Sequence, residues 1–270
     1  MNTKKRESDI LSVSGMLPFL SDKKTAGKIH IHPSLESTNK TAKELAAAGA
    51  AYGTVVMAEC QSAGRGRRGR SFFSPPAHGI YMSFILRPSP RHRAYAPTLI
   101  TLYAAVSVCG ALESAAQKKP QIKWVNDIFL NGRKVCGILT EAVTDFESGG
   151  MRWAVVGIGV NFTAPESGFP EELRDTAGAV FSGEPSVTRN RLAAEIINRM
   201  ADFENRFDGK ETLGEYKKRL ITLGKKVQIS NSNETYEALA VDIDEAGRLI
   251  VKKDDGQIQP LSSGEVSIGR

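Results

Sequence analysis

The sequence predicts an α+β protein in which a large domain of strands and helices is followed by a small β-barrel. Up to residue 222, apolar stretches with strand alternation and stretches with helical spacing follow one another along the chain. After Gly224 the pattern changes to short strands separated by turns at 245–247 and 254–256. We therefore expect an N-terminal extension at 1–33, a main domain at 34–222 and a small C-terminal domain at 223–270.

The extension shows little periodicity and several charges. It can hold at most one short helix at 9–20, which Gly15 and Pro18 would interrupt. We expect it to be either a disordered segment or a strut packed against the main domain, and removal of residues 1–28 to be tolerated.

The main domain opens with three polar residues, Ser37, Thr38 and Asn39, before an alanine-rich stretch at 40–50. This order is typical of a helix N-terminus. The three side chains could only cap the helix, or they could also bind the polar head of a ligand, and the residues leave both interpretations open.

The remaining elements follow from periodicity. Pro97 opens an apolar helix at 97–116, and Asn131-Gly132 is the turn of a hairpin at 128–142. Two glycines in the apolar strand 153–162 indicate either a bulge or a close approach by a backbone or ligand. The other expected elements are strands at 53–59, 79–87 and 121–127, helices at 188–207 and 211–222, and C-terminal strands at 226–230, 236–242, 249–253 and 266–268.

The stretch 61–74 joins two expected strands and carries four arginines among three glycines. Glycine lets a ligand approach the main chain, and arginine guanidinium groups match phosphate and carboxylate oxygens. The alternatives are a solvated basic loop or a segment that coats nucleic acid. Because the stretch is held between two strands, we favour an ordered anion-binding site. It lacks the P-loop arrangement, and its GxGxxG spelling at 64–69 opens no helix as a dinucleotide site would.

Composition narrows further the classes of protein to which this sequence could belong. The net charge is +6, from 36 basic and 30 acidic residues, and the four loop arginines supply +4 of it. Such a local excess favours a focused anion site over a broad nucleic-acid face. No apolar run approaches the roughly 20 residues of a membrane span, and no signal peptide is evident.

The three cysteines, Cys60, Cys109 and Cys136, are widely spaced in apolar runs. They form neither a disulfide framework nor a zinc pattern, so we expect free buried thiols and a reducing cytoplasm. The four histidines show no metal-type pairing with them, and no protein metal site is predicted.

Polar and charged residues recur at the ends of the expected strands. Besides the cluster 37–39 and the arginine–glycine loop, they include Lys123 with Asn126-Asp127, Lys134, and Gly159 with Asn161. Converging positive groups and backbone amides fit a ligand with phosphates plus a carboxylate. They predict nucleotide-dependent activation of an acid.

These motifs resemble those of the biotin protein ligases. The matching pieces follow the family's order over residues 34–270: Ser37-Thr38-Asn39, the loop 61–70 with Phe73-Ser74-Pro75, Lys123-Trp124-Val125-Asn126-Asp127, Lys134 with Gly137-Ile138-Leu139 and Glu141, Gly157-Ile158-Gly159-Val160-Asn161, and Gly264-Glu265-Val266-Ser267-Ile268. The resemblance implies a mixed β-sheet catalytic domain flanked by helices, of the class II synthetase type, and an SH3-like C-terminal barrel. It also implies a two-step reaction that uses ATP, biotin and Mg²⁺. Biotinyl-5′-AMP forms with release of pyrophosphate, and the biotinyl group then passes to a lysine of a biotin carboxyl carrier domain.

The resemblance further implies the site residues. Arg67, near the phosphate, and Lys134, which would neutralise the carboxylate and the charge at phosphorus, would be catalytic. The biotin-binding residues would be Ser37, Thr38, Asn39, Gln61, Gly64, Arg65, Gly66, Arg67, Lys134 and Gly159. The ATP-binding residues would be Arg67, Arg68, Arg70, Phe72, Lys123, Asn126, Asp127 and Asn161. Phe72 stands where the family often has a tryptophan, and Val125 where it commonly has a proline.

Two alternatives stay open at this stage. One is a lipoate or octanoate ligase of the same fold, although the full arginine–glycine loop favours biotin. The other is an arginine–glycine module that binds nucleic acid. We expect no DNA partner, because 33 residues cannot hold the winged helix that some relatives carry, no membrane association, and a monomer or homodimer.

Overall fold

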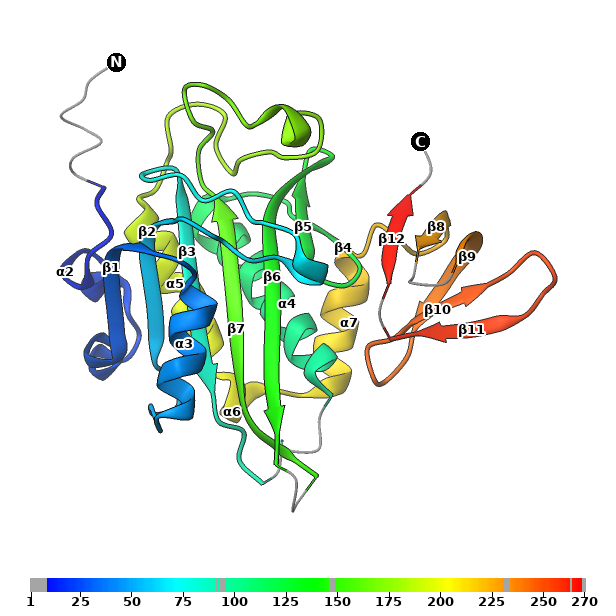
Figure 1. Ribbon diagram of the computed structural model, residues 1–270, viewed down its shortest axis with the longest axis horizontal. Coiled ribbons are helices and arrows are strands. Elements are labelled where there is room, and N and C mark those ends of the chain that lie inside the picture. Colours follow the sequence, from blue (N-terminus) through cyan, green and yellow to red (C-terminus); the bar gives the residue numbers. More distant parts are fainter. Residues whose placement is uncertain are drawn as a thin grey trace.

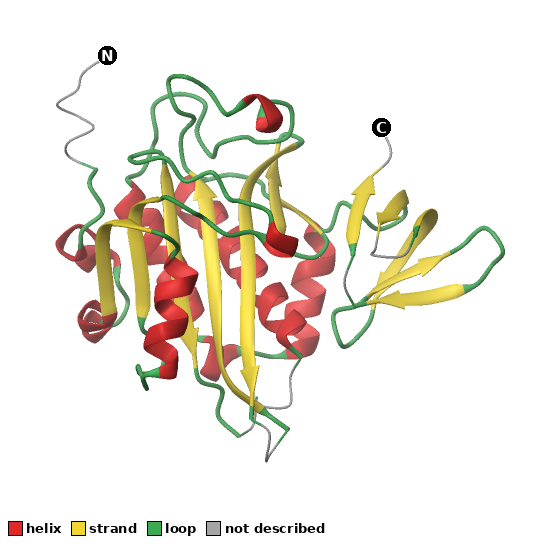
Figure 2. Cartoon of the chain, in the orientation of Figure 1, coloured by secondary structure: helices red, strands yellow, loops and turns green. Residues whose placement is uncertain are grey.

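The structure of the chain is a computed structural model that describes residues 9–90, 92, 96–145, 149–230, 234–262 and 264–268. A large sheet with helices on both faces stands beside a smaller all-β domain (Figures 1 and 2). The predicted α+β class, with a mixed sheet flanked by helices and a C-terminal β domain, is confirmed.

The large sheet is mixed. Its seven strands are β1 (Ile29–Leu35), β2 (Val55–Gln61), β3 (Gly79–Leu86), β4 (Gln121–Lys123), β5 (Asp127–Leu130), β6 (Arg133–Thr144) and β7 (Met151–Asn161). They lie in the order β1-β2-β3-β7-β6-β5-β4. β1 and β2 pair in parallel, and the other neighbours pair antiparallel.

Helices cover both faces of this sheet. On one face lies α3 (Thr38–Ala47), and its Ala42 and Ala46 pack against Val56, Ile85 and Val155 of three strands. The opposite face carries α4 (Pro97–Ala116), α5 (Arg189–Ala201), α6 (Phe203–Arg206) and α7 (Gly209–Arg219) (Figure 1). The shorter helical turns are α2 (Val13–Met16), η1 (Leu17–Phe19), η2 (Lys23–Lys28), η3 (Arg67–Gly69) and η4 (Glu171–Leu173).

Helix α4 is long and apolar enough to cross a membrane, by length and composition alone. The expectation that no stretch approaches that length is therefore wrong. Thirteen of its 20 residues are buried, and the helix packs against the sheet, α5 and α7. We interpret it as a core helix, whose apolar character follows from burial on most sides.

Residues 9–33 are a strut, the second of the two forms expected for this segment. Leu11, Met16 and Leu20 are buried in the main hydrophobic core, and β1, which begins at Ile29, is the edge strand of the sheet. The boundary at residue 33 stays a prediction, but the structure argues against removing residues 1–28 without loss. Burying side chains of this size stabilises a fold by about 1.5–3 kcal/mol each.

The C-terminal domain is a five-stranded antiparallel sheet. Its strands are β8 (Lys226–Ser230), β9 (Thr235–Ile243), β10 (Leu249–Lys252), β11 (Ile258–Leu261) and β12 (Glu265–Ile268), in the order β11-β10-β9-β8-β12. Trp124 Nε1 of the main domain donates to Gly247 O at 3.1 Å. The buried side chains of this domain, Val227 and Leu249 among them, are continuous with the main core. The two domains are therefore packed together.

Several local expectations differ from the structure, among them the strand expected at 121–127, of which β4 forms only Gln121–Lys123. β1 and β11 were not predicted, and the helix expected at 188–207 ends at Ala201 before a second short helix begins at Phe203. Cys109 and Cys136 are free and buried as expected, but Cys60 is only partly buried.

Candidate functional site

Residues 62–78, which we call the ligand loop, connect the end of β2 to the start of β3. The loop crosses towards β5 and returns, with η3 at its far end (Figure 1). Gly66 N donates to Arg70 O at 2.7 Å and Phe72 N donates to Gly64 O at 2.8 Å, so the loop is folded on itself. At its tip, Arg68 (φ 56°) and Gly69 (φ 75°) are both left-handed, the geometry of a type I′ turn. The arginine–glycine stretch thus forms a defined turn.

A cluster of hydrogen-bonded polar side chains, which we call the polar cluster, lies where the ligand loop leaves β2. Gln61 Oε1 accepts from Thr38 N (2.9 Å) and Thr38 Oγ1 (3.2 Å), and Gln61 Nε2 donates to Ser74 Oγ (2.8 Å). Ser37 is 2% exposed at the N-cap of α3, but its side chain makes no capping hydrogen bond. Capping alone is therefore the wrong interpretation for Ser37. The polar cluster contains both donors and acceptors, as recognition of a cyclic amide requires.

Asn39 lies beside the polar cluster and is held by three neighbours. Its Nδ2 donates to Leu139 O (3.2 Å) and to Glu141 Oε2 (3.0 Å), while its Oδ1 accepts from Ser83 Oγ at 2.6 Å. Ser83 Oγ also lies 2.8 Å from Thr38 Oγ1. Both amide protons of Asn39 are therefore used within the protein. Its role as a direct biotin contact stays a prediction.

Glu141 was part of the sequence resemblance but not of the predicted site residues. Its Oε1 lies 2.7 Å from Lys43 Nζ and 3.4 Å from Arg65 Nη1. Burial raises the pKa of this carboxyl, but hydrogen bonds from Lys43 and Asn39 outweigh it, so the pKa lies below its usual value. Glu141 thus joins helix α3, strand β6 and the ligand loop. A carboxylate within an otherwise apolar strand was the sequence signal.

A track of glycines crosses the sheet beside the polar cluster. Gly137 of β6 and Gly159 of β7 are paired in the sheet, and the Phe72 ring lies over both. A Cβ at Gly159 would come within 2.6 Å of that ring, and a Cβ at Gly157 would overlap the Asn39 amide. The glycines therefore allow the Phe72 ring and the Asn39 amide to approach the strands closely. Close approach was one of the two interpretations of the strand glycines. Gly64 plays a similar part in the loop, where a Cβ would overlap Phe72 O.

The other end of the track is polar and positively charged. Arg67 Nη1 donates to Asn126 Oδ1 at 2.9 Å, and Lys134 Nζ forms an ion pair with Asp127 Oδ1 at 2.7 Å. Burial lowers the pKa of the Arg67 guanidinium from its usual value, although the group stays charged. Lys123 pairs with Asp127 in the β4–β5 ladder. Four of the predicted ATP-side residues are thus brought together.

Two predicted ATP-side residues point elsewhere. Asn161 Nδ2 donates to Gly178 O at 3.0 Å, which holds the segment after η4 against β7. Arg68 Nη1 donates to Ser230 O at 3.1 Å, at the end of β8 in the C-terminal domain. Their nucleotide contacts, like those of Arg70, stay predictions. Ser83, which sequence reasoning missed, and Ser74, which was part of the sequence resemblance but not of the predicted site residues, complete the polar cluster.

Comparison with known proteins identifies the family to which this chain is similar. The Biotin/lipoate A/B protein ligase family matches residues 31–161, and the Biotin protein ligase C terminal domain matches residues 222–269. The chain is 36% identical over 245 residues to the bifunctional ligase/repressor BirA of Bacillus subtilis, covering 88% of this chain and 73% of that protein. It is 31% identical over 245 residues to the biotin--[acetyl-CoA-carboxylase] ligase of Paracoccus denitrificans, covering 87% of this chain and 98% of that one.

A solved structure agrees with these sequence matches. The biotin protein ligase from Aquifex aeolicus in complex with biotin and ATP matches with a TM-score of 0.74 and 27% identity, over 90% of this chain and 99% of that one. Fold and site together define a protein of the biotin and lipoate ligase class. Within that class, the chain belongs to the biotin protein ligase family.

Proposed function

We propose that this chain attaches biotin to a lysine of a biotin carboxyl carrier domain, with ATP consumed to form biotinyl-5′-AMP. One observation carries the proposal. The polar cluster, with its mixed donors and acceptors, and the cationic end lie on the two sides of one glycine track, as a ring amide and an acid to be activated would require. The 31% identity to a biotin--[acetyl-CoA-carboxylase] ligase and the match to the Biotin protein ligase C terminal domain support biotin as the acid.

In the first step, a carboxylate oxygen of biotin attacks the α-phosphorus of ATP, and the bond to pyrophosphate breaks. Negative charge then gathers on the phosphorus oxygens beside the track. The Lys134 ammonium and the Arg67 guanidinium stand at that end, and both are fixed by neighbours, Asp127 and Asn126. Preorganised positive groups of this kind stabilise developing charge without having to reorient.

In the second step, the carrier lysine amine attacks the carbonyl carbon of the adenylate. AMP leaves, an amide forms, and the amine loses its proton. Until the carrier arrives, the mixed anhydride must be kept from water. The ligand loop, whose Phe72 ring already lies on the track, is the element that would cover it.

Magnesium would be bound mainly through the nucleotide. Among the described residues, no group of three or more His, Cys, Asp or Glu side chains is arranged to hold a metal ion. Mg²⁺ usually takes one or two carboxylates plus substrate phosphates and keeps several waters. Asp127 at the cationic end fits that pattern as the one protein ligand. The ion would neutralise phosphate charge.

The test is pyrophosphate exchange by the purified protein with biotin, ATP and Mg²⁺, followed by transfer of labelled biotin to a carrier domain. We expect exchange that depends on biotin and is not supported by lipoate or octanoate. Exchange supported by lipoate instead would favour the alternative ligase. No exchange with any of these acids would contradict the proposal.

The proposal also covers the partners of the protein and its cellular compartment. We place the protein in the cytoplasm, with a carrier domain as its macromolecular partner, as a monomer or homodimer that does not associate with membranes. We expect no operator DNA binding, because the +2 charge left outside the loop arginines gives little to hold phosphates. A sequence-specific mobility shift of DNA that depends on the adenylate would contradict this.

A further inference from the structure

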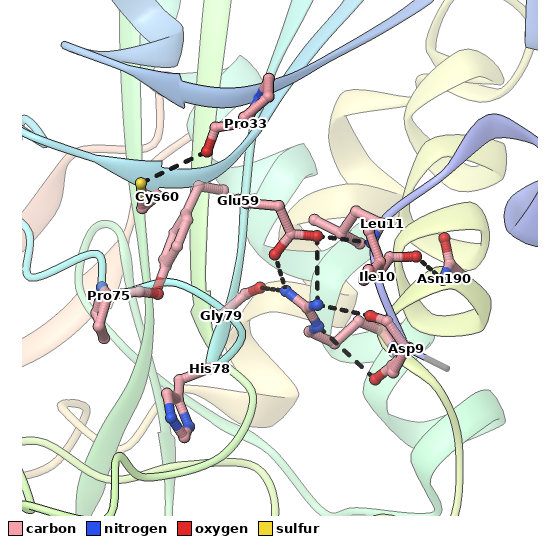
Figure 3. Close-up of polar contacts among 12 residues, drawn as sticks. Asp9, Ile10, Leu11, Pro33, Glu59, Cys60, Pro75, His78, Gly79 and Asn190 are labelled. Atoms are coloured by element: carbon pink, nitrogen blue, oxygen red, sulfur yellow. Dashed lines mark hydrogen bonds and ion pairs between the residues drawn. The ribbon is translucent and has the colours of Figure 1, made fainter. Parts of the chain in front are cut away.

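The base of the ligand loop is held by a buried arginine of helix α5. Arg189 is 2% exposed, and its Nη1 donates to Glu59 Oε2 at 2.8 Å and to Gly79 O at 3.2 Å (Figure 3). Glu59 lies near the end of β2 and Gly79 is the first residue of β3. One guanidinium therefore joins the two strands between which the ligand loop runs.

The N-terminal strut is the third segment in this contact. Arg189 Nη2 donates to Asp9 O at 2.6 Å, and Arg189 N donates to Asp9 Oδ1 at 2.9 Å. Leu11 N donates to Glu59 Oε1 at 2.6 Å, so the strut also binds the carboxylate that Arg189 holds. Next to Arg189, Asn190 Nδ2 donates to Ile10 O (Figure 3). Ser12 N donates to Asn190 Oδ1.

Two carboxylates, Asp9 and Glu59, share one guanidinium, and burial raises the pKa of Asp9. Removing Arg189 leaves two partly buried carboxylates without their cation, and removing either carboxylate leaves the buried guanidinium with a single anionic partner. Both changes favour rearrangement of the segments that carry these groups.

The contact lies close to the biotin side of the proposed site. Glu59 precedes Gln61 by two residues on β2, so both side chains emerge from the same short stretch of strand. Gln61 receives the Thr38 hydrogen bonds, and its backbone N donates to Ser74 O across the loop. A shift of the β2 end would move Gln61 relative to Thr38 and Ser74.

We propose that Arg189, clamped between Glu59 and the Asp9–Leu11 strut, is a positioning residue that fixes the β2 end and so sets biotin affinity. The inference rests on the proposed function. Arg189 touches neither substrate nor the reacting atoms, so its effect is exerted through Gln61 and the loop base. It also gives the N-terminal strut a part in substrate binding.

The test uses four variants of the full chain. Arg189→Met removes the guanidinium, Glu59→Gln and Asp9→Asn remove one carboxylate charge each at nearly constant shape, and Arg199→Met is the control. Arg199 lies on the same helix, and its side chain pairs with Glu195 and hydrogen-bonds Ser114 of α4. The measurements are the KM for biotin and for ATP in pyrophosphate exchange, hydrogen exchange at residues 58–64, and Tm.

We expect Glu59→Gln and Arg189→Met to raise the biotin KM by about 10- to 100-fold, the range that displacement of about 1 Å can produce. The ATP KM should change little, and exchange at 58–64 should quicken. Asp9→Asn should act in the same direction, and Arg199→Met should resemble the parent. If Arg189→Met fails to fold, the biotin KM values of Glu59→Gln and Asp9→Asn decide whether the inference holds.

A purely structural role predicts a lower Tm with an unchanged biotin KM and unchanged exchange at 58–64, and that result would overturn the inference. Equal increases in both KM values would overturn it too. A parent protein with no biotin-dependent exchange would instead refute the proposed function, so the two failures are distinguishable.

Discussion

Substituting Gly157 by alanine tests whether the glycine track leaves the space that Asn39 needs beside the polar cluster. The new Cβ would overlap Asn39 Oδ1 and lie 2.8 Å from its Cγ, and Asn39 is buried, at 3% exposed, so its amide would have to shift. Displacing it breaks two neutral hydrogen bonds, about 0.5–1.5 kcal/mol each, and one to the Glu141 carboxylate, about 1.5–3 kcal/mol. Because partial relaxation keeps some of these bonds, we expect a loss of about 2–4 kcal/mol in the free energy of unfolding.

The assay is urea unfolding together with the biotin KM in pyrophosphate exchange. Gly183→Ala is the matched control, because a Cβ there meets nothing within 4 Å and its φ is not left-handed. We expect Gly157→Ala to be less stable and to bind biotin more weakly than either the parent or the control. A Gly157→Ala protein that matches Gly183→Ala in both measurements would refute the reasoning.

Two further predictions concern the loop and the charged end. Arg67→Ala should release the adenylate and label lysines indiscriminately, whereas Lys134→Ala should suppress adenylate formation, since the loop arginine covers the intermediate and the ammonium follows developing charge. Labelled biotin in the separated half-reactions checks this, and two variants that form and retain adenylate like the parent would contradict it. The loop at 62–74 should lose protease sensitivity and hydrogen exchange on addition of biotin and ATP, because an anion relieves repulsion among four arginines. Unchanged exchange would count against that expectation.

Helices and turns that depend on residues within their own segment were predictable, whereas a strand that depends on a distant partner was not. Pro97 and the apolar run behind it predicted α4 with its observed bounds, and Asn131-Gly132 adopts the two positive φ angles of a hairpin turn, 51° and 75°. β1 was missed because its stability comes from parallel pairing with β2, a contact from outside its own sequence. Its stretch at 29–35 alternates apolar and polar residues only over Ile29–His32, and Pro33 interrupts the pattern.

The site was predictable in its residue types but not in its pairings. Sequence placed Arg67, Asn126, Asp127 and Lys134 at strand ends, and the fold brings them together. It could not show that Arg65 faces Glu141, because that distance depends on how β6 lies beside the loop. The role proposed for Arg189 was equally out of reach, since its partners are 130 and 180 residues away in sequence.

The bond from Arg68 to Ser230 O bears on how the two domains could be exchanged between relatives. Its acceptor is a main-chain carbonyl, so no particular side chain is required at that position. A chimaera with another relative's barrel could keep the contact despite an unrelated sequence, provided that β8 ends at the same place. Register, more than residue identity, would then decide whether a transplanted barrel still meets the loop.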